Sequence, residues 1–225
     1  MFEETIILSV GGSIIIPEKI DSGFVKKFVG LVNRHGDKRF VIVCGGGHIA
    51  RYYRDTAKKL NKVSDEDLDW VGIKATKLNA EFIRSVFGSL AYEKVVDDPT
   101  AKISTEKRVI IAAGWKPGCS TDMDAVYLAE NFNASMLINL SNIEYVYDKD
   151  PRKFKDACKK ERLTWKEFRS IVGDKWTPGL NAPFDPVAAK QSEKIKLKVI
   201  IANGKDIDNL DNILAGKKFR GTVVE

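Results

Sequence analysis

Short apolar runs rich in β-branched residues alternate along this chain with longer segments of helical periodicity, and this alternation constrains the fold more than any other feature. Runs at 5–10, 39–44, 107–113, 135–140 and 197–202 are typical of strands buried on both faces. Strands that alternate with helices favour a mainly parallel sheet covered on both sides. We therefore expect an α/β fold, a three-layer α-β-α sandwich around a central, mainly parallel sheet.

The remaining expected elements are helices and weaker strands. Helices are expected at 22–34, 48–60, 66–87, 122–132, 164–172, 185–195 and 207–214, and further strands at 93–96, 144–148 and 220–224. Thr164 followed by Glu167 predicts a capping box at the start of one of these helices. Since no linker-like stretch divides the chain, we expect a single domain, 1–225.

Composition narrows the class of protein and its partners. The formal net charge of +6 arises from lysines spread along all 225 residues, which is typical of a solvated surface and also suits a phosphate-rich ligand. No nucleic-acid motif stands out, and the apolar N-terminal run is too short for a bilayer and lacks the basic start of a signal peptide. Three widely spaced cysteines without a CxxC pair argue against zinc and disulfides. We expect a cytoplasmic protein with neither a nucleic-acid nor a membrane partner.

Four expected strands are followed by loops rich in glycine and small polar residues. The sequence has GGS at 11–13, GGGHIAR at 45–51, GWKPGCSTD at 114–122 and SNIEYVYDKDP at 141–151. The carboxyl ends of parallel strands meet at one edge of the sheet, where ligands bind. Glycine lets backbone N–H groups approach a ligand closely, and helix N-termini attract anions. The first two loops therefore predict a site for two phosphate-bearing groups, or for two ends of one ligand.

Two known phosphate-binding motifs do not account for these loops. The GxxxxGK[ST] loop is absent from the sequence. Gly45-x-Gly47-x-x-Ala50 fits a dinucleotide-binding fingerprint. It follows the second strand instead of the first, and the acidic residues at 65–69 begin a helix instead of ending a strand. The pattern therefore disfavours a dinucleotide site.

The loop before the helix at 122–132 holds more polar groups than a turn requires. Ser120, Thr121 and Asp122 are all good N-cap residues, although one helix needs only one of them. Gly118 and Asp124 make the cluster denser. Such a loop can bind phosphate through N–H and hydroxyl donors, while a carboxylate contacts sugar hydroxyls or orders catalytic groups.

The ordered set of motifs resembles the amino acid kinase superfamily, and within it the UMP kinases of archaeal and bacterial type. The motifs are GGS, VCGGGHIARYY, DWVGIKATKLNA, GCSTDMDAV, LSNIEYVYDKDP, PFDPVAAK and GKKFRGTVV, and they span roughly residues 5–224. The resemblance implies that family's carbamate-kinase-like fold and ATP-dependent phosphorylation of UMP to UDP in pyrimidine nucleotide synthesis. It also implies Mg²⁺ bound with ATP, without a cage built by the protein, and a homo-oligomer, with a hexamer as its expected size, formed through the helices at 48–86.

The resemblance also assigns roles to individual residues. ATP is expected at Gly11, Gly12, Ser13, Asn142, Tyr145, Tyr147 and Asp150, and UMP at Gly45, Gly46, Arg51, Asp69, Ser120 and Thr121. Asp122, Asp185 and Lys190 are the expected catalytic residues. The acceptor-binding part is then expected at about 1–135 and the ATP-binding part at about 136–225.

The chain departs from the family pattern in its first strand. Many relatives carry a lysine there, whereas this chain has Ser9, so positive charge near the transferred phosphoryl group must come from elsewhere. Lys116 and Lys190 could supply it. Trp115 and Trp176 also add aromatic surface near the expected site, which bears on the identity of the acceptor.

The sequence leaves alternatives open for the residues and for the function. Asp69 could only favour its helix dipole, Asp150 could form a turn, Tyr145 and Tyr147 could be core residues, Asp185 could be an N-cap and Arg51 could be solvated. The function could instead be that of another kinase of this fold with a different phosphate or carboxylate acceptor. A non-catalytic nucleotide or oxyanion binder is the remaining alternative.

Overall fold

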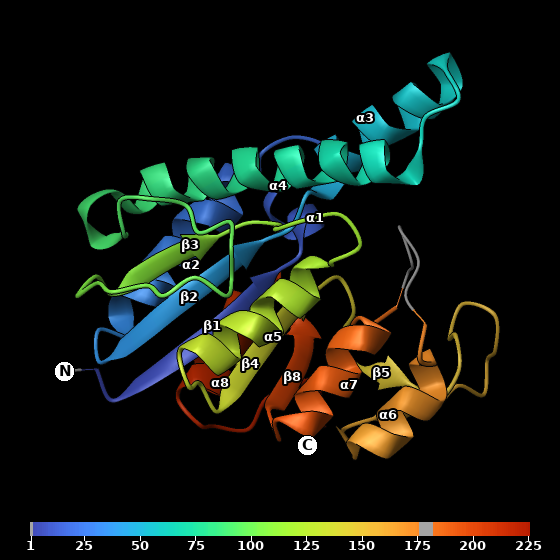
Figure 1. Ribbon diagram of the computed structural model, residues 1–225. Helices are drawn as coiled ribbons and strands as arrows, with labels where there is room; N and C mark the ends of the chain where they lie inside the picture. The colour runs from blue at the N-terminus through green and yellow to red at the C-terminus, as the bar shows by residue number, and fades with distance from the viewer. Residues whose placement is uncertain (1, 176–181) are drawn as a thin grey trace.

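A seven-stranded sheet forms the centre of the molecule, with helices on both of its faces (Figure 1). The computed structural model describes residues 2–175 and 182–225, so Trp176 lies outside the described residues. The strand order is β3-β2-β1-β4-β8-β9-β7. These strands are β1 (Glu4–Val10), β2 (Lys38–Cys44), β3 (Val109–Ala112), β4 (Met136–Ser141), β7 (Arg162–Leu163), β8 (Lys198–Asn203) and β9 (Thr222–Val224). Within the described part of this sheet, only the pairing of β8 with β9 is antiparallel, so the sheet is mainly parallel.

Two separate apolar cores lie on the two faces of this sheet. Because successive strand side chains point to opposite faces, Ile6 and Leu8 contribute to one core and Ile7 to the other. The first core is covered by α2 (Ser22–Arg34), α8 (Ile207–Leu214) and the inner side of α4 (Asp65–Phe87). The second is covered by α5 (Thr121–Asn131), α6 (Trp165–Val172) and α7 (Pro186–Lys194). The expected three-layer sandwich is therefore confirmed.

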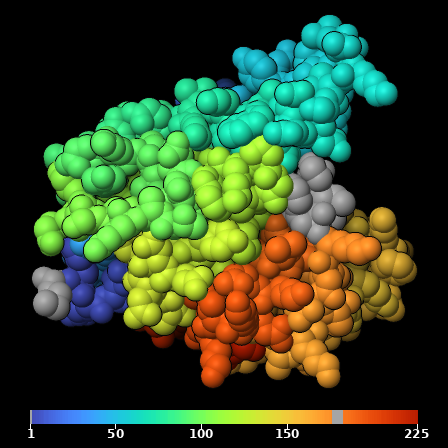
Figure 2. Space-filling view, viewed as in Figure 1, coloured from blue at the N-terminus to red at the C-terminus, as the bar shows by residue number. Residues whose placement is uncertain are grey.

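The smaller elements lie around this sandwich. They are α1 (Gly12–Ile15), α3 (Gly47–Leu60), the 3-10 helix η1 (Gly88–Leu90) and a hairpin of β5 (Val146–Tyr147) with β6 (Lys159–Lys160). The end of α3 and the start of α4 project from the body of the molecule, at the upper right of Figures 1 and 2. Within α3 only Ala50 is buried. No described helix is at once long enough and apolar enough to cross a membrane.

The strand expected at 93–96 is wrong. Val96 forms only an isolated bridge with Ala112, and Ala91 forms another with Val109. Asp97, Asp98 and Pro99 follow directly, and these residue types are poor strand formers. The segment therefore contacts the edge strand β3 without extending the sheet.

The strand register brings four loops together at the carboxyl edge of the sheet. Val10, the last residue of β1, is paired with Cys44 at the end of β2 and with Leu140 near the end of β4. Val43 is paired with Ala112, the last residue of β3. The loops that follow these strands therefore start side by side.

Candidate active site

Two glycine turns are packed against each other at this edge. We call Gly11–Ser13, after β1, the first glycine turn and Gly45–Gly47, after β2, the second. A Cβ atom on Gly12 would lie 2.1 Å from the backbone nitrogen of Gly47, and a Cβ atom on Gly47 would lie 2.4 Å from the carbonyl oxygen of Gly12. Gly47 also has a φ of 64°, which favours glycine. The two turns thus form one continuous surface of backbone.

This backbone surface is suited to anions. The helix α3 begins at Gly47, and the first N–H groups of a helix have no partner within the helix. The positive end of the helix dipole lies at the same place. A side chain joins the two turns, because the Arg51 guanidinium donates to the Ser13 hydroxyl at 3.2 Å. The arginine that resemblance assigns to one substrate thus lies beside the turn assigned to the other.

Asp122 lies between β1 and α7 and accepts a hydrogen bond from each side. The Ser9 hydroxyl donates to its Oδ1 at 3.1 Å, and the backbone N–H of Asp185 donates to its Oδ2 at 3.1 Å. Burial raises the pKa of Asp122 to about 6, and the Asp185 charge adds to this, although both hydrogen bonds act to lower it. The two hydrogen bonds therefore hold the Asp122 carboxylate at a buried position where its ionised form is destabilised.

Asp185 is the N-cap of α7, one of the two roles that the sequence left open for it. Its side chain caps α7 by accepting from the N–H groups of Val187 at 2.5 Å and Ala188 at 3.1 Å. Its own N–H donates to Asp122. Lys190 is exposed in the second turn of the same helix. The two expected catalytic aspartates are therefore in contact through the Asp185 backbone, whereas Lys190 has no hydrogen bond to either of them in the described part of the chain.

The loop at 114–120 is fastened to α4 and α5 by hydrogen bonds. The Gly114 N–H donates to the Thr76 hydroxyl at 2.8 Å, and the Gly118 N–H donates to the Asp69 carboxylate at 3.0 Å. Ser120 caps α5 by accepting from the N–H of Met123. Asp69 thus does more than favour its own helix dipole, because it positions the loop.

Asp124 is a buried carboxylate that the sequence reasoning did not assign to the site. It accepts from the Trp115 N–H at 3.2 Å and from the Cys119 thiol at 3.2 Å. Burial raises the pKa of Asp124 to about 7, and the negative charge of Asp122 adds to this rise. The hydrogen bonds from Cys119 and Trp115 and the positive charge of Lys116 act to lower the pKa. The dense polar pattern around Asp122 was the only sequence signal for this residue.

We predict that Asp124→Asn stabilises the protein at pH 8. The folded pKa lies above the ordinary value of 3.8, so the folded state holds a proton between about pH 4 and pH 7 that the unfolded state has lost. Wild-type stability therefore falls as pH rises through this range. Asparagine can still accept from Trp115 without a buried charge. We expect Asp124→Asn to raise the free energy of unfolding, measured in urea, by about 3 kcal/mol at pH 8 and by almost nothing at pH 4. Equal increases at both pH values would contradict this.

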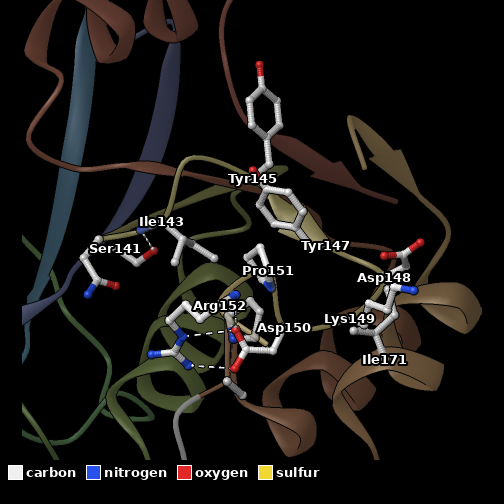
Figure 3. Close-up of a pocket in the computed structure, with 13 residues that line it drawn as sticks. Ser141, Ile143, Tyr145, Tyr147, Asp148, Lys149, Asp150, Pro151, Arg152 and Ile171 are labelled. Carbon is white, nitrogen blue, oxygen red and sulfur yellow. Dashed lines mark hydrogen bonds and ion pairs between the residues drawn. The ribbon is translucent and has the colours of Figure 1, made fainter. Parts of the chain in front are cut away.

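The loop after β4 and the hairpin that follows form a cleft of about 490 Å³ (Figure 3). Four of the residues expected to bind ATP line it, namely Asn142, Tyr145, Tyr147 and Asp150. Figure 3 shows Asp150 and Arg152 facing each other, and Nε and Nη2 of Arg152 donate to the carboxylate at 3.0 and 3.1 Å. Asp150 also accepts from the Arg152 N–H, as expected for a turn. Tyr145 is both buried and part of the cleft wall.

Among the described residues, the Asp122 carboxylate has hydrogen bonds to Ser9 and Asp185 and none to a lysine, so no such contact identifies the lysine that takes the place of the missing strand-one lysine. Lys116 lies over the Trp115 ring, with Nζ 3.7 Å from the ring centroid. This cation–π contact keeps the ammonium group on the 114–120 loop. Ser9, at the lysine position itself, contacts Asp122 through a neutral hydroxyl.

The comparison with known proteins decides the family. The model of the amino acid kinase family matches residues 4–203 of this chain. The chain belongs to the amino acid kinase family. The uridylate kinases of Thermoplasma volcanium and Thermococcus kodakarensis are each 34% identical to this amino acid kinase over 224 residues. The first match covers 99% of this chain and 98% of the relative, and the second covers 98% and 99%.

Solved structures agree with this assignment. The crystal structure of uridylate kinase from Archaeoglobus fulgidus has a TM-score of 0.83 at 32% identity, covering 98% of this chain and 99% of that chain. UMP kinase from Ureaplasma parvum has a TM-score of 0.79 at 19% identity, with 100% of both chains covered, which shows the fold alone. The expected amino acid kinase fold and family are confirmed, and the chain is a phosphotransferase.

Proposed function

We propose that this amino acid kinase transfers the γ-phosphoryl group of ATP to UMP, giving UDP and ADP in pyrimidine nucleotide synthesis. Its full-length similarity to proteins named uridylate kinase supports this choice of acceptor. The observation that carries the proposal is the contact of the two glycine turns at one edge of the sheet. Two adjoining anion sites suit a reaction that joins two phosphates.

The proposed arrangement of substrates follows the order of the loops. The ATP base and ribose occupy the cleft beside Tyr147 and Asp150, and the ATP phosphates extend to the first glycine turn. The UMP phosphate lies on the second glycine turn beside Arg51, whose planar guanidinium suits bidentate binding of phosphate. The 114–120 loop encloses the UMP nucleoside. In this proposal the acceptor part remains about 1–135 and the ATP part about 136–225.

Phosphoryl transfer needs in-line placement and charge compensation more than covalent help from the protein. Arg51 and the backbone N–H groups supply positive potential on the acceptor side. Asp122 and Asp185 order the groups around the transferred phosphoryl. Lys116 is the lysine that we favour for charge compensation, because its loop is hydrogen-bonded to Asp124, two residues from Asp122. Lys190 stays a prediction.

Mg²⁺ bound with ATP is part of the proposal. Each Asp122 carboxylate oxygen accepts one hydrogen bond, so each still has a lone pair to offer a metal. Mg²⁺ takes oxygen ligands and keeps several waters when phosphates bind it. Asp122 and Asp185 therefore fit as the carboxylates that would hold this ion, directly or through water. Bound there, it would neutralise phosphate charge.

We also propose that the chain works as a cytoplasmic homo-oligomer, with a hexamer as the expected size. Its cysteines are free, which suits a reducing compartment. Large apolar side chains are exposed on α3 and α4, including Tyr52 (62% exposed), Leu60 (82%) and Leu78 (61%). Such a surface marks a contact between proteins. Light scattering tests this, and the mass of a single chain at micromolar concentration would contradict it.

The function is tested by the choice of acceptor. Purified protein is mixed with Mg-ATP and UMP, CMP, AMP, GMP, carbamate or a small phosphate monoester, and ADP release is followed. We expect kcat/KM for UMP to exceed that for every other acceptor at least about tenfold, a difference of about 1.4 kcal/mol in transition-state binding. Turnover of another acceptor would keep the ATP half and overturn the UMP assignment. Nucleotide binding without any turnover would favour a non-catalytic binder.

A further inference from the structure

Asn79 connects α4 to the second glycine turn from beneath. Its side chain is 1% exposed and lies one residue before Ala80, which belongs to the first apolar core. Its Nδ2 donates to the carbonyl oxygen of Gly45 at 2.8 Å and to that of Gly46 at 3.2 Å. One amide group therefore binds two successive peptide units of the turn.

These two hydrogen bonds fix the direction of the N–H groups in the same peptide units. In a trans peptide the C=O and N–H bonds point in opposite directions, and the chain has no cis peptide bond in its described part. The carbonyls of Gly45 and Gly46 point toward Asn79. The N–H groups of Gly46 and Gly47 therefore point away from α4.

Asn79 is the only hydrogen-bond donor to the Gly45 carbonyl among the described residues, but its own side chain also carries a cost in stability. Its Oδ1 is buried and has no hydrogen-bond partner among the described residues. A buried acceptor without a partner costs about 1–3 kcal/mol, which offsets most of what two hydrogen bonds contribute. An apolar residue of similar size would remove this cost but leave the buried Gly45 carbonyl without its donor, so the net change in stability would be small.

We propose that Asn79 is a positioning residue for the acceptor phosphate, aiming the N–H groups of Gly46 and Gly47 by holding the carbonyls of Gly45 and Gly46. The inference rests on the proposed function, in which the second glycine turn binds a nucleoside monophosphate. Asn79 acts through the backbone and does not touch the substrate. Its loss therefore weakens acceptor binding more than ATP binding or turnover.

The test compares Asn79→Leu with a matched variant, Asn209→Leu. Asn209 is also a buried asparagine, and its Nδ2 donates to the carbonyl oxygen of Arg220 at 2.7 Å, but it lies on α8. For Asn79→Leu we expect KM for UMP to rise at least about tenfold, with KM for ATP and kcat changed less than about threefold. For Asn209→Leu we expect all three values to stay within about threefold of wild type.

Other outcomes separate the inference from the proposed function. Equal rises in both KM values, a fall in kcat alone, or no change would overturn the role of Asn79. If Asn79→Leu does not fold, Asn79→Ser, which keeps one hydrogen-bond donor, is measured in its place. The same result is then required: a rise in KM for UMP that exceeds any rise in KM for ATP. If the wild type does not turn over UMP, the proposed function fails. Titration of inorganic phosphate then still decides whether Asn79→Leu weakens the anion site.

Discussion

Gly12→Ala is expected to abolish turnover and to lower the free energy of unfolding by about 3 kcal/mol or more. The new Cβ atom would lie 2.1 Å from the Gly47 nitrogen and 2.5 Å from the Gly45 carbonyl oxygen. Both neighbours are backbone atoms, so no side chain can rotate away. Relief requires the two glycine turns to separate, which would move the proposed ATP and UMP phosphates apart. Urea unfolding and ADP release measure the two effects.

Gly30→Ala is the matched control. Gly30 lies within α2, and its added Cβ atom would have only the Arg34 Nη1 atom in contact, at 4.0 Å. Alanine is a better helix former than glycine, so this variant should gain up to about 1 kcal/mol and keep its activity. A folded Gly12→Ala protein with wild-type kcat would show that the contact between the turns is dispensable.

The sheet was predictable because each of its central strands is a mainly apolar run. The run at 39–44 corresponds to β2, Lys38–Cys44, to within one residue. The prediction of a strand at 93–96 was wrong because pairing at the edge of a sheet depends on the neighbouring strand, which the local sequence pattern does not contain. The short strands β6 and β7 were missed for the same reason, since Lys159–Lys160 and Arg162–Leu163 show no apolar alternation.

The positions of the site residues were predictable in part. The pattern indicated that glycine loops follow β1 and β2, but not that Gly12 would contact Gly47. That contact depends on the register that pairs Val10 with Cys44 and on the backbone path after each strand. The family resemblance identified Asp122 and Asp185 separately, and the hydrogen bond between them joins residues that are 63 positions apart in the sequence. The catalytic and binding roles themselves stay predictions.

The residues that the sequence missed act over long distances in the chain. Asn79 is separated from Gly45 by 34 positions and Ser9 from Asp122 by 113. Asn79 lies within the DWVGIKATKLNA motif but was given no role of its own, and Ser9 was noted only because a lysine was expected there. Single-residue reasoning finds caps and turns, which are local, but not partners brought together by the sheet.

Asp122→Asn is expected to lower kcat by about 100-fold or more, because groups that order or compensate charge in a phosphoryl transfer site contribute on this scale. The same substitution should leave the fold intact. The asparagine Oδ1 can accept from the Asp185 N–H, while its Nδ2 can donate to the Ser9 hydroxyl. ADP release with saturating UMP and ATP measures kcat, and circular dichroism checks the fold.

Stability at pH 8 is the second readout, and it distinguishes a functional carboxylate from a structural one. With a folded pKa near 6, Asp122 keeps its proton in the folded state between about pH 4 and pH 6, so its ionisation destabilises the protein as pH rises through that range. Asparagine removes this cost, and we expect a gain of about 2 kcal/mol at pH 8. Asp206→Ala, which removes the N-cap of α8, is expected to have the opposite effect. It should lower the free energy of unfolding by about 1 kcal/mol and leave kcat unchanged. A structural Asp122 would follow the Asp206 pattern, whereas one held for catalysis loses turnover while the protein gains stability.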